Sequence, residues 1–343
     1  MAENQKWVVT ISPFVNPQLG SKKFLGSPER YQNYIDVWEK YIAPIDPEGE
    51  GDWEDFFEQA ARLDAAINSF GVENIYLKTS SYDFYTYLAD GSKITSDELP
   101  SDAKYYGIVY SYNSFFHPER GRDHKVDRYA WLETFQANAG RKISVAGFNA
   151  EKSKDILKEM VAFSQMGIKE VYLKTIQAKK GLWVFDLPEN LDEEQAVELL
   201  RDVMDWGLIT AEGLNDGLIL QEKIVMEYEY RMFIIDNKVV TGAGCVEEYT
   251  PLDNEAVFDF KVRRNRQAVS PVEASESLVE RLRVFGQEMA QKLSEEQPEL
   301  SDYVLDAALG SDGKPLIIEL NPLSNAGLYA CEPQKITDAL NQK

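Results

Sequence analysis

The sequence predicts an α+β protein that begins with an α/β segment. In the first part of the chain, apolar runs typical of strands alternate with segments whose apolar residues recur at helical spacing. Further on, amphipathic helices are mixed with pairs of strands joined by short polar turns, a pattern that predicts antiparallel hairpins. With 343 residues, of which 44% are hydrophobic, the chain can build two or three domains with sizeable cores.

The first part of the chain is expected to form strands and helices in turn. Gly71 and Gly140 each follow a helical pattern, at the position where helices commonly end. We place a domain boundary near the second glycine, which gives an N-terminal α/β domain over 1–138 and a second domain over 139–343. The expected strands are 6–14, 73–79 and 104–112, and the expected helices are 28–42, 53–71 and 127–140.

The second part is expected to be richer in hairpins. Asp236-Asn237 and the stretch Ser311–Lys314 are turn sequences between apolar runs. Each therefore predicts a hairpin, the first over 229–249 and the second over 301–320. The other expected strands are 142–148, 168–175, 181–187 and 216–224, and the other expected helices are 151–167, 192–207 and 273–293.

The charge balance narrows the classes of partner. The formal net charge is −22, from 58 acidic and 36 basic residues, which argues against binding to nucleic acids or anionic membranes. The sequence offers no signal-peptide pattern and no apolar run long enough to span a membrane, so we expect a cytoplasmic protein. Cys245 and Cys331 have no metal-type spacing and are expected to be free thiols.

The basic residues gather in three islands, at 117–128, 177–181 and 261–266. A single island of this kind is explained by a solvated loop with acidic neighbours. Three islands in a strongly acidic protein favour a local anionic ligand, because the local field steers such ligands.

Two polar residues stand at the end of the last apolar run, "LIIELN". Glu319 and Asn321 are two positions apart, so on a strand their side chains face the same side. Asp306 lies on the preceding strand of the same hairpin, where the two strands bring side chains together. Carboxylate and amide oxygens are the ligands that Mg²⁺ prefers, so these residues predict a magnesium site. Alone, Glu-x-Asn is weak, because it is equally explained as a loop cap.

The motifs together resemble the ATP-grasp enzymes. "LILQEKI" with the hairpin "EYRMFIIDNKVV" resembles their adenine hinge, "VRRN" their Arg-x-Asn segment, and "VLDAAL…GKPLIIELNP" their closing metal hairpin. The resemblance covers roughly residues 140–330, is greatest to the RimK-like branch, and in the order of its elements also fits phage-encoded members. It implies two α+β subdomains that clasp ATP, with two Mg²⁺ ions or Mn²⁺ in their place.

The resemblance also implies roles for individual residues. The phosphates would be contacted by Lys142, Lys174 and, from the next loop, Lys180; the adenine hinge would be Gln221, Glu222, Lys223 and Ile224; Glu229 would bind the ribose; Arg231, Arg263 and Asn265 would be catalytic; and Asp306, Glu319 and Asn321 would be metal ligands. The loop after Lys174 departs from the family, because it holds one glycine where the family is glycine-rich. We expect the three metal ligands to face away from the core.

The implied activity is ligation of a carboxylate to an amine, or to a thiol, through an acyl phosphate. The substrates would be small molecules or peptides, the chain could form a homo-oligomer, and Arg120, Arg122 and Arg128 of the N-terminal domain could bind a carboxylate. An ATP-grasp kinase and a non-catalytic nucleotide-binding protein are the alternatives. A nucleotidyltransferase-type ligase is disfavoured, because the sequence lacks Lys-x-Asp-Gly.

Overall fold

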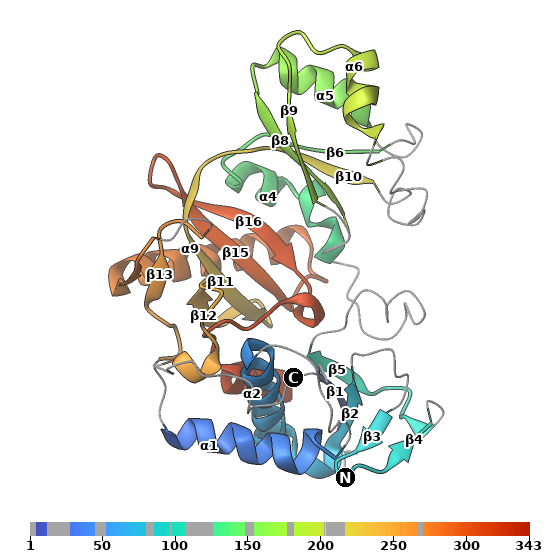
Figure 1. The fold of residues 1–343 in the computed structure, drawn as a ribbon, viewed down its shortest axis with the longest axis vertical. Helices are drawn as coiled ribbons and strands as arrows, with labels where there is room; N and C mark the ends of the chain where they lie inside the picture. Colours follow the sequence, from blue (N-terminus) through green and yellow to red (C-terminus); the bar gives the residue numbers. More distant parts are fainter. Residues whose placement is uncertain are drawn as a thin grey trace.

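The computed structural model places three sheets one after another along the long axis of the molecule (Figure 1). The description below covers the residues with a defined placement: 5–11, 28–44, 53–79, 86–95, 98–107, 126–147, 154–176, 182–201, 203, 217–254, 256–266 and 270–343. No helix within these ranges combines the length and the apolar character that a membrane crossing requires.

The N-terminal sheet has five strands in the order β4-β3-β2-β1-β5. β1 pairs in parallel with β2 and with β5, while β3 and β4 extend one edge as antiparallel strands. α2 packs against β1 and β2, and α1 packs against α2. The elements are β1 (Trp7–Ile11), α1 (Pro28–Val37), the π-helical turn η2 (Trp38–Ile42), α2 (Trp53–Phe70), the 3₁₀ turn η3 (Val72–Asn74), β2 (Ile75–Thr79), β3 (Thr86–Leu88), β4 (Lys93–Ile94) and β5 (Lys104–Gly107).

The second sheet has the order β7-β6-β10-β8-β9 and is covered by α5 and α6 (Figure 1). α6 begins with a capping box in which the Asp192 side chain accepts a hydrogen bond from the backbone N–H of Gln195. The elements are η5 (Val126–Trp131), α4 (Glu133–Asn138), β6 (Ile143–Gly147), β7 (Lys154–Asp155), α5 (Ile156–Gln165), β8 (Glu170–Thr175), β9 (Leu182–Asp186), α6 (Glu193–Leu199) and β10 (Leu218–Glu222).

The third sheet has the order β12-β11-β15-β16, so both expected hairpins form and lie side by side. Asp236 and Asn237 have φ values of 50° and 60°, as the tight turn between β11 and β12 requires. The elements are β11 (Met226–Ile235), β12 (Lys238–Gly244), η6 (Pro251–Asp253), β13 (Lys261–Arg263), β14 (Val272–Ala274), α9 (Glu276–Glu296), β15 (Tyr303–Gly310), β16 (Pro315–Asn321), η7 (Leu323–Asn325) and α10 (Pro333–Asn341).

Helices cover both faces of the third sheet. Met232 and Ile234 on β11 belong to the core beneath α9, while Phe233 and Ile235 face the other way, toward α10 and the N-terminal sheet. That second core also contains Trp7 of β1, so it runs across the expected boundary between 1–138 and 139–343. The division into two domains stays a prediction, and the two parts share one apolar core.

Three sequence expectations need correction. The helix expected over 127–140 is instead η5 followed by α4, because Leu132 is extended and Glu296 of α9 accepts hydrogen bonds from the backbone N–H groups at the start of α4. The basic strand at 261–266 ends at Arg263 and pairs with β14, which was not expected. The helix α10 was missed altogether. The end of the strand expected over 104–112, and the end of the helix expected over 192–207, lie outside the described residues.

Candidate active site

Three charged residues form a row across adjacent strands of the third sheet. Arg231 on β11 pairs in register with Asp306 on β15, and Asp306 pairs with Glu319 on β16. The register between β15 and β16 shifts directly after Asp306, so β16 carries one additional residue there. Such a bulge changes the direction of nearby side chains, and here it sets Glu319 opposite Asp306. We call Arg231, Asp306 and Glu319 the charged row.

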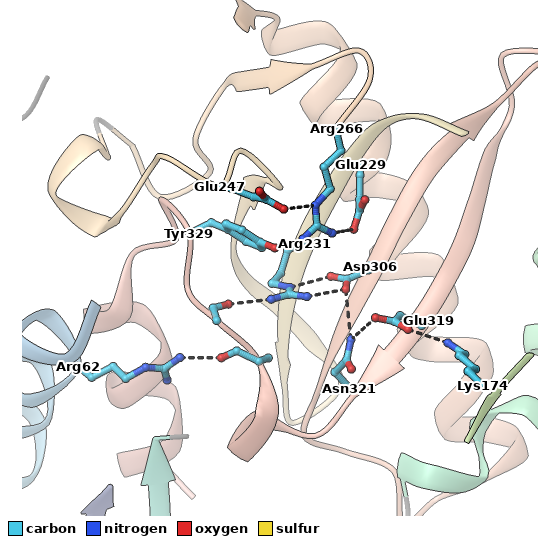
Figure 2. A network of polar contacts seen from close by, with 12 residues as sticks. Arg62, Lys174, Glu229, Arg231, Glu247, Arg266, Asp306, Glu319, Asn321 and Tyr329 are labelled. Atoms are coloured by element: carbon cyan, nitrogen blue, oxygen red, sulfur yellow. Dashed lines mark hydrogen bonds and ion pairs between the residues drawn. The ribbon is translucent and has the colours of Figure 1, made fainter. Parts of the chain in front are cut away.

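Hydrogen bonds join the row to Asn321 (Figure 2). Arg231 donates from Nε and Nη2 to the two oxygens of Asp306, at 2.8 and 2.7 Å. The Asn321 Nδ2 donates to both carboxylates, at 3.2 Å to Asp306 and 3.0 Å to Glu319. The structure thus brings together the three residues that the sequence singled out as metal ligands.

The burial of these residues differs from the sequence expectation. Asp306 is 1% exposed and Asn321 is 6% exposed, so neither faces away from the core. The Glu319 side chain keeps 32% of its surface accessible. The expectation of surface-facing ligands was wrong for Asp306 and Asn321, because the third sheet is covered on both faces.

Lys174 reaches the row from the second sheet. Its Nζ donates to Glu319 at 2.7 Å and lies 5.5 Å from the centre of the Tyr129 ring. Burial would raise the pKa of Glu319, but the charge of Lys174 and the hydrogen bonds from Lys174 and Asn321 outweigh it and hold the pKa at about 2. Glu319 is therefore a carboxylate at any neutral pH, fixed between the two sheets.

A second group of charges lies beside the row. Arg266 donates to Glu229 at 3.0 Å, to Glu247 at 3.2 Å and to the Tyr329 hydroxyl at 2.9 Å (Figure 2). Burial raises the pKa of Glu229, and the negative charge of Asp306 raises it further, while the nearby arginines lower it in part. The guanidinium of Arg231 lies 4.9 Å from the Tyr329 ring, so that ring contacts both arginines. Sequence analysis missed Arg266 as a site residue, although it belongs to the basic island at 261–266.

Arg263 and Asn265 lie apart from the charged row. Arg263 forms an ion pair with Glu248, with one N–O distance of 3.0 Å. The backbone N–H of Asn265 donates to Ser270 at 3.2 Å, and Arg264 pairs with Glu227 at 2.9 Å. The roles expected for Arg263 and Asn265 stay predictions, and Arg266 is the arginine of this segment that pairs beside the row.

The expected hinge links the second and third sheets. Gln221 is buried, and its side-chain oxygen accepts two hydrogen bonds from Arg141, at 3.2 and 3.0 Å. Arg141 also donates to the backbone carbonyls of Ile317 and Ile318, so it ties β10 to β16. Glu222 and Lys223 continue the ladder through their backbone N–H groups, and Ile224 follows at the turn into β11.

The side chains of the two lysines chosen near this hinge point to other roles. Lys142 is exposed, while its sequence neighbour Arg141 is the buried residue that contacts the third sheet. The Lys223 side chain pairs with Glu170. Lys180 lies outside the described residues, as do Arg120 and Arg122, and Arg128 is exposed. No sequence signal distinguished Arg141 from Lys142.

A loop connects the row to the N-terminal part of the chain. Arg231 donates from Nη1 to the carbonyl of Gly327 at 3.1 Å, and Arg62 of α2 donates to the carbonyl of Ala326 at 2.7 Å (Figure 2). Arg62 is fully buried and pairs with Glu58 at 2.9 Å. Two arginines from different parts of the chain thus hold adjacent peptide groups, and sequence analysis missed Arg62.

The donor chemistry of the row fits a divalent cation. Within the described part of the chain, no group of three or more His, Cys, Asp or Glu side chains is gathered closely enough to hold a metal ion. The expected set has two carboxylates, Asp306 and Glu319, and its third member, Asn321, is an amide that bridges them. These are hard oxygen donors of the kind that Mg²⁺ prefers. In this structure the charges of the two carboxylates are balanced by Arg231 and Lys174.

The fold and the row define a nucleotide-binding domain of the ATP-grasp type, with two sheets joined by a hinge and a row of charges at the closing hairpin. The chain belongs to a family described as an ATP-grasp domain, the second family of its clade, whose model matches residues 168–339, half of the chain. This match confirms the expected fold, and the family implies ATP together with a divalent metal ion.

Solved structures resemble the chain at low sequence identity. D-cycloserine synthetase DcsG matches at 11% identity over 98% of each chain, with a TM-score of 0.49. D-alanyl-alanine synthetase A from Vibrio cholerae O1 biovar eltor str. N16961 matches at 10% identity over 99% of this chain and 97% of that chain, with a TM-score of 0.47. A RimK domain protein ATP-grasp from Sphaerobacter thermophilus DSM 20745 matches at 10% identity over 82% of this chain and 94% of that chain, with a TM-score of 0.44. Among curated proteins, none matches the sequence.

Proposed function

We propose that the protein is an ATP-dependent ligase that joins a carboxylate to an amine through an acyl-phosphate intermediate and releases ADP and phosphate. The observation that carries the proposal is the meeting of Lys174 with Glu319, which sets a cation of the second sheet against the carboxylates of the third. Phosphoryl transfer depends mainly on positioning and on the neutralisation of phosphate charge, and this row supplies groups for both.

The balance of charge supports phosphate binding at the row. Asp306, Glu319 and Glu229 carry negative charge, and Arg231, Lys174 and Arg266 carry positive charge, each within an ion pair. A bound divalent cation would neutralise phosphate charge, and Asp306, Glu319 and Asn321 would hold it. Carboxylates occupied in this way leave Lys174 and Arg231 available to pair with phosphate oxygens. Arg263, Asn265, Lys142 and Lys180 stay as proposed contacts that reach phosphate only with ATP bound.

The proposed chemistry needs no nucleophile from the protein. A substrate carboxylate attacks the γ-phosphorus of ATP, the bond to the β–γ bridging oxygen breaks, and ADP leaves. The amine then attacks the acyl carbon, inorganic phosphate leaves, and the amine loses a proton. Lys174 and Arg231 would stabilise charge on the transferring phosphoryl group, while the backbone of Glu222, Lys223 and Ile224 would bind adenine and Glu229 the ribose. A thiol in place of the amine would give a thioester by the same steps.

Hydroxylamine trapping tests the proposal. Acyl phosphates react with hydroxylamine to give hydroxamates, whereas phosphate esters do not. The full-length protein would be incubated with ATP, Mg²⁺ and pools of carboxylates, with mass spectrometry of the hydroxamates and assays of ADP. We expect hydroxamate formation that depends on one class of carboxylate. ADP formation that requires an alcohol and gives a stable phosphate ester would instead identify a kinase.

Two variants serve as the matched pair for this assay. Glu319→Gln should lower ADP formation by about 100-fold or more, because it removes the charge shared by Lys174 and the expected metal ion. Asp312→Asn lies at the exposed turn of the same hairpin and should leave the rate unchanged. Equal rates in the two variants would contradict the assignment of the row.

A further inference from the structure

A pocket of about 560 Å³ lies between the N-terminal helices and the C-terminal helix. Its walls come from α1, α2, the segment 254–257 and the start of α10. The chain segment 326–332 separates it from the charged row, since Tyr329 contacts Arg231 while Glu332 lines the pocket. The pocket is therefore a different site from the proposed ATP site.

One wall of the pocket is held by Arg30. Its guanidinium donates to the carbonyls of Pro251 and Asn254, at 2.9 and 3.1 Å, and to Glu332 at 3.0 Å. These bonds tie α1 to the second half of the chain. Because they engage both terminal nitrogens of Arg30, this arginine is committed to the wall and offers little to an incoming anion.

Two polar side chains of the pocket lack strong partners. The nearest donor to the Asp64 carboxylate is the Asn68 amide at 3.5 Å, and Asp64 forms no ion pair within the described part of the chain. Burial raises the pKa of Asp64, although Arg30 lowers it, and Glu332 raises it further. Asp64 is thus a half-buried carboxyl group close to a second carboxylate.

Tyr34 is the second such side chain. It is 4% exposed and lines the pocket, and its hydroxyl makes no hydrogen bond to any residue that the structure describes. Arg30, Glu332 and Asp64, all lining residues, are the charges that act on this hydroxyl. A buried hydroxyl without a partner is costly, so its place among these charges indicates a ligand that bonds to it.

The charges of the pocket select the class of ligand. Glu29, Asp64 and Glu332 are acidic, whereas the basic residues are Arg30, which is already bonded, and the exposed Lys335. We propose that this pocket binds a primary ammonium group, of a small amine or of a peptide N-terminus. The ammonium N–H groups donate to the carboxylates of Asp64 and Glu332 and to the hydroxyl oxygen of Tyr34. The proposal does not depend on the ligase chemistry, because the site has its own walls and its own partners.

Binding measurements on the full-length protein without ATP test the proposal. The probes are butylamine, the dipeptide amide Ala-Ala-NH₂, and butyrate as the anion of matched size, each titrated by calorimetry. We expect saturable binding of at least one amine and none of butyrate. Binding of butylamine alone identifies a small-amine site, and binding of the dipeptide amide identifies a peptide N-terminus. Saturable binding of butyrate, or the absence of binding by both amines, overturns the proposal.

Two variants and one control locate the binding. Asp64→Asn should weaken amine binding by about 10-fold or more, because it removes the charge of the acceptor. Tyr34→Phe keeps the packed ring and removes only the hydroxyl, so it should weaken binding by a smaller factor with the fold intact. Asp36→Asn changes an exposed acid of α1 outside the pocket and should have no effect. Equal affinity in Asp64→Asn, Tyr34→Phe and Asp36→Asn would overturn the assignment.

Discussion

At the scale of single residues, Glu319 has two partners that act in the same direction. Lys174 and Asn321 both stabilise its ionised form, and their effect exceeds the opposing effect of burial. The carboxylate is accordingly held charged and oriented before any ligand arrives. Preorganised charge of this kind is what phosphoryl-transfer sites require, because the protein need not reorganise during the reaction.

The lowered pKa of Glu319 predicts a pH dependence of stability. Its folded-state pKa of about 2 lies below the ordinary value of 4.5, so its contribution is present above the ordinary value and lost as the pH falls toward the folded-state value. We expect Glu319→Gln to lower the unfolding free energy by about 1–2 kcal/mol at neutral pH, less than the full shift because the side chain is partly exposed. Urea unfolding at about pH 6 and about pH 3 should show this difference shrinking by roughly half or more. A difference that is the same at both pH values would contradict it.

The arginines at 263–266 give a second residue-scale prediction. Arg266 pairs with Glu229 beside the charged row, whereas Arg263 pairs with Glu248 and Arg264 with Glu227. We expect Arg266→Ala to lower kcat by about 100-fold, as loss of a group that stabilises the transition state does. Arg264→Ala, the control, should change kcat by less than about 3-fold, as for an exposed ion pair.

Steady-state kinetics on three variants would decide between the two arginines. The sequence resemblance assigns the phosphate role to Arg263, and the pairing in the structure favours Arg266. A larger loss of kcat in Arg263→Ala than in Arg266→Ala would favour the resemblance. It would also mean that the ion pair of Arg263 with Glu248 opens when ATP binds.

At the scale of elements, α2 is connected to β11 through the loop 326–327. Arg62 holds the carbonyl of Ala326, and Arg231 holds the carbonyl of Gly327. Gly327 has little room around it, since an added Cβ would lie 3.4 Å from Glu58 and 3.8 Å from Arg231. We infer that Arg62 is a positioning residue, which acts on the row through this loop.

This role of Arg62 can be tested with a paired substitution. Arg62→Met together with Glu58→Gln removes the ion pair without leaving a buried charge unpaired. We expect kcat to fall by about 10-fold with little change in the nucleotide Kd, because the loop loses a bond that positions Arg231. Arg62→Lys should recover part of the rate. Unchanged kcat in the double variant would show that the loop is held without Arg62.

At the scale of the whole molecule, few polar contacts join the second and third sheets. Lys174 meets Glu319, and Arg141 bonds to Gln221 on one sheet and to two carbonyls on the other. The rest of the connection among the described residues includes the hinge after β10. A ligand that bridges the sheets should therefore stabilise the assembly of both, by the free energy of its binding.

Thermal unfolding tests this expectation. At 100 times its Kd, ATP with Mg²⁺ should stabilise the protein by about 2.7 kcal/mol, which raises Tm by a few degrees for a chain of this size. Lys174→Ala should weaken nucleotide binding by about 1.5–3 kcal/mol, the range for a hydrogen bond to a charged group, and so reduce the shift in Tm. Lys142→Ala, at an exposed lysine of the same region, is the control. Equal shifts in the two variants would contradict the phosphate role of Lys174.

The sequence by itself determined the local features of this protein. Alternation and turn residues located both hairpins of the third sheet, because side-chain period and backbone φ preference are properties of a few adjacent residues. The two-residue spacing of Glu319 and Asn321, with Asp306 on the partner strand, was enough to predict that these side chains meet.

Only the tertiary structure decided the rest, because it depends on residues far apart in the chain. Burial of Asp306 follows from the helices that cover both faces of the sheet, and the choice of Arg141 over Lys142 follows from where β16 passes. Arg62 and Arg266 became site residues through contacts with a distant loop and a distant strand. Adjacent lysines and arginines look alike in a sequence, and the packing of other elements around them determines which one is buried and paired.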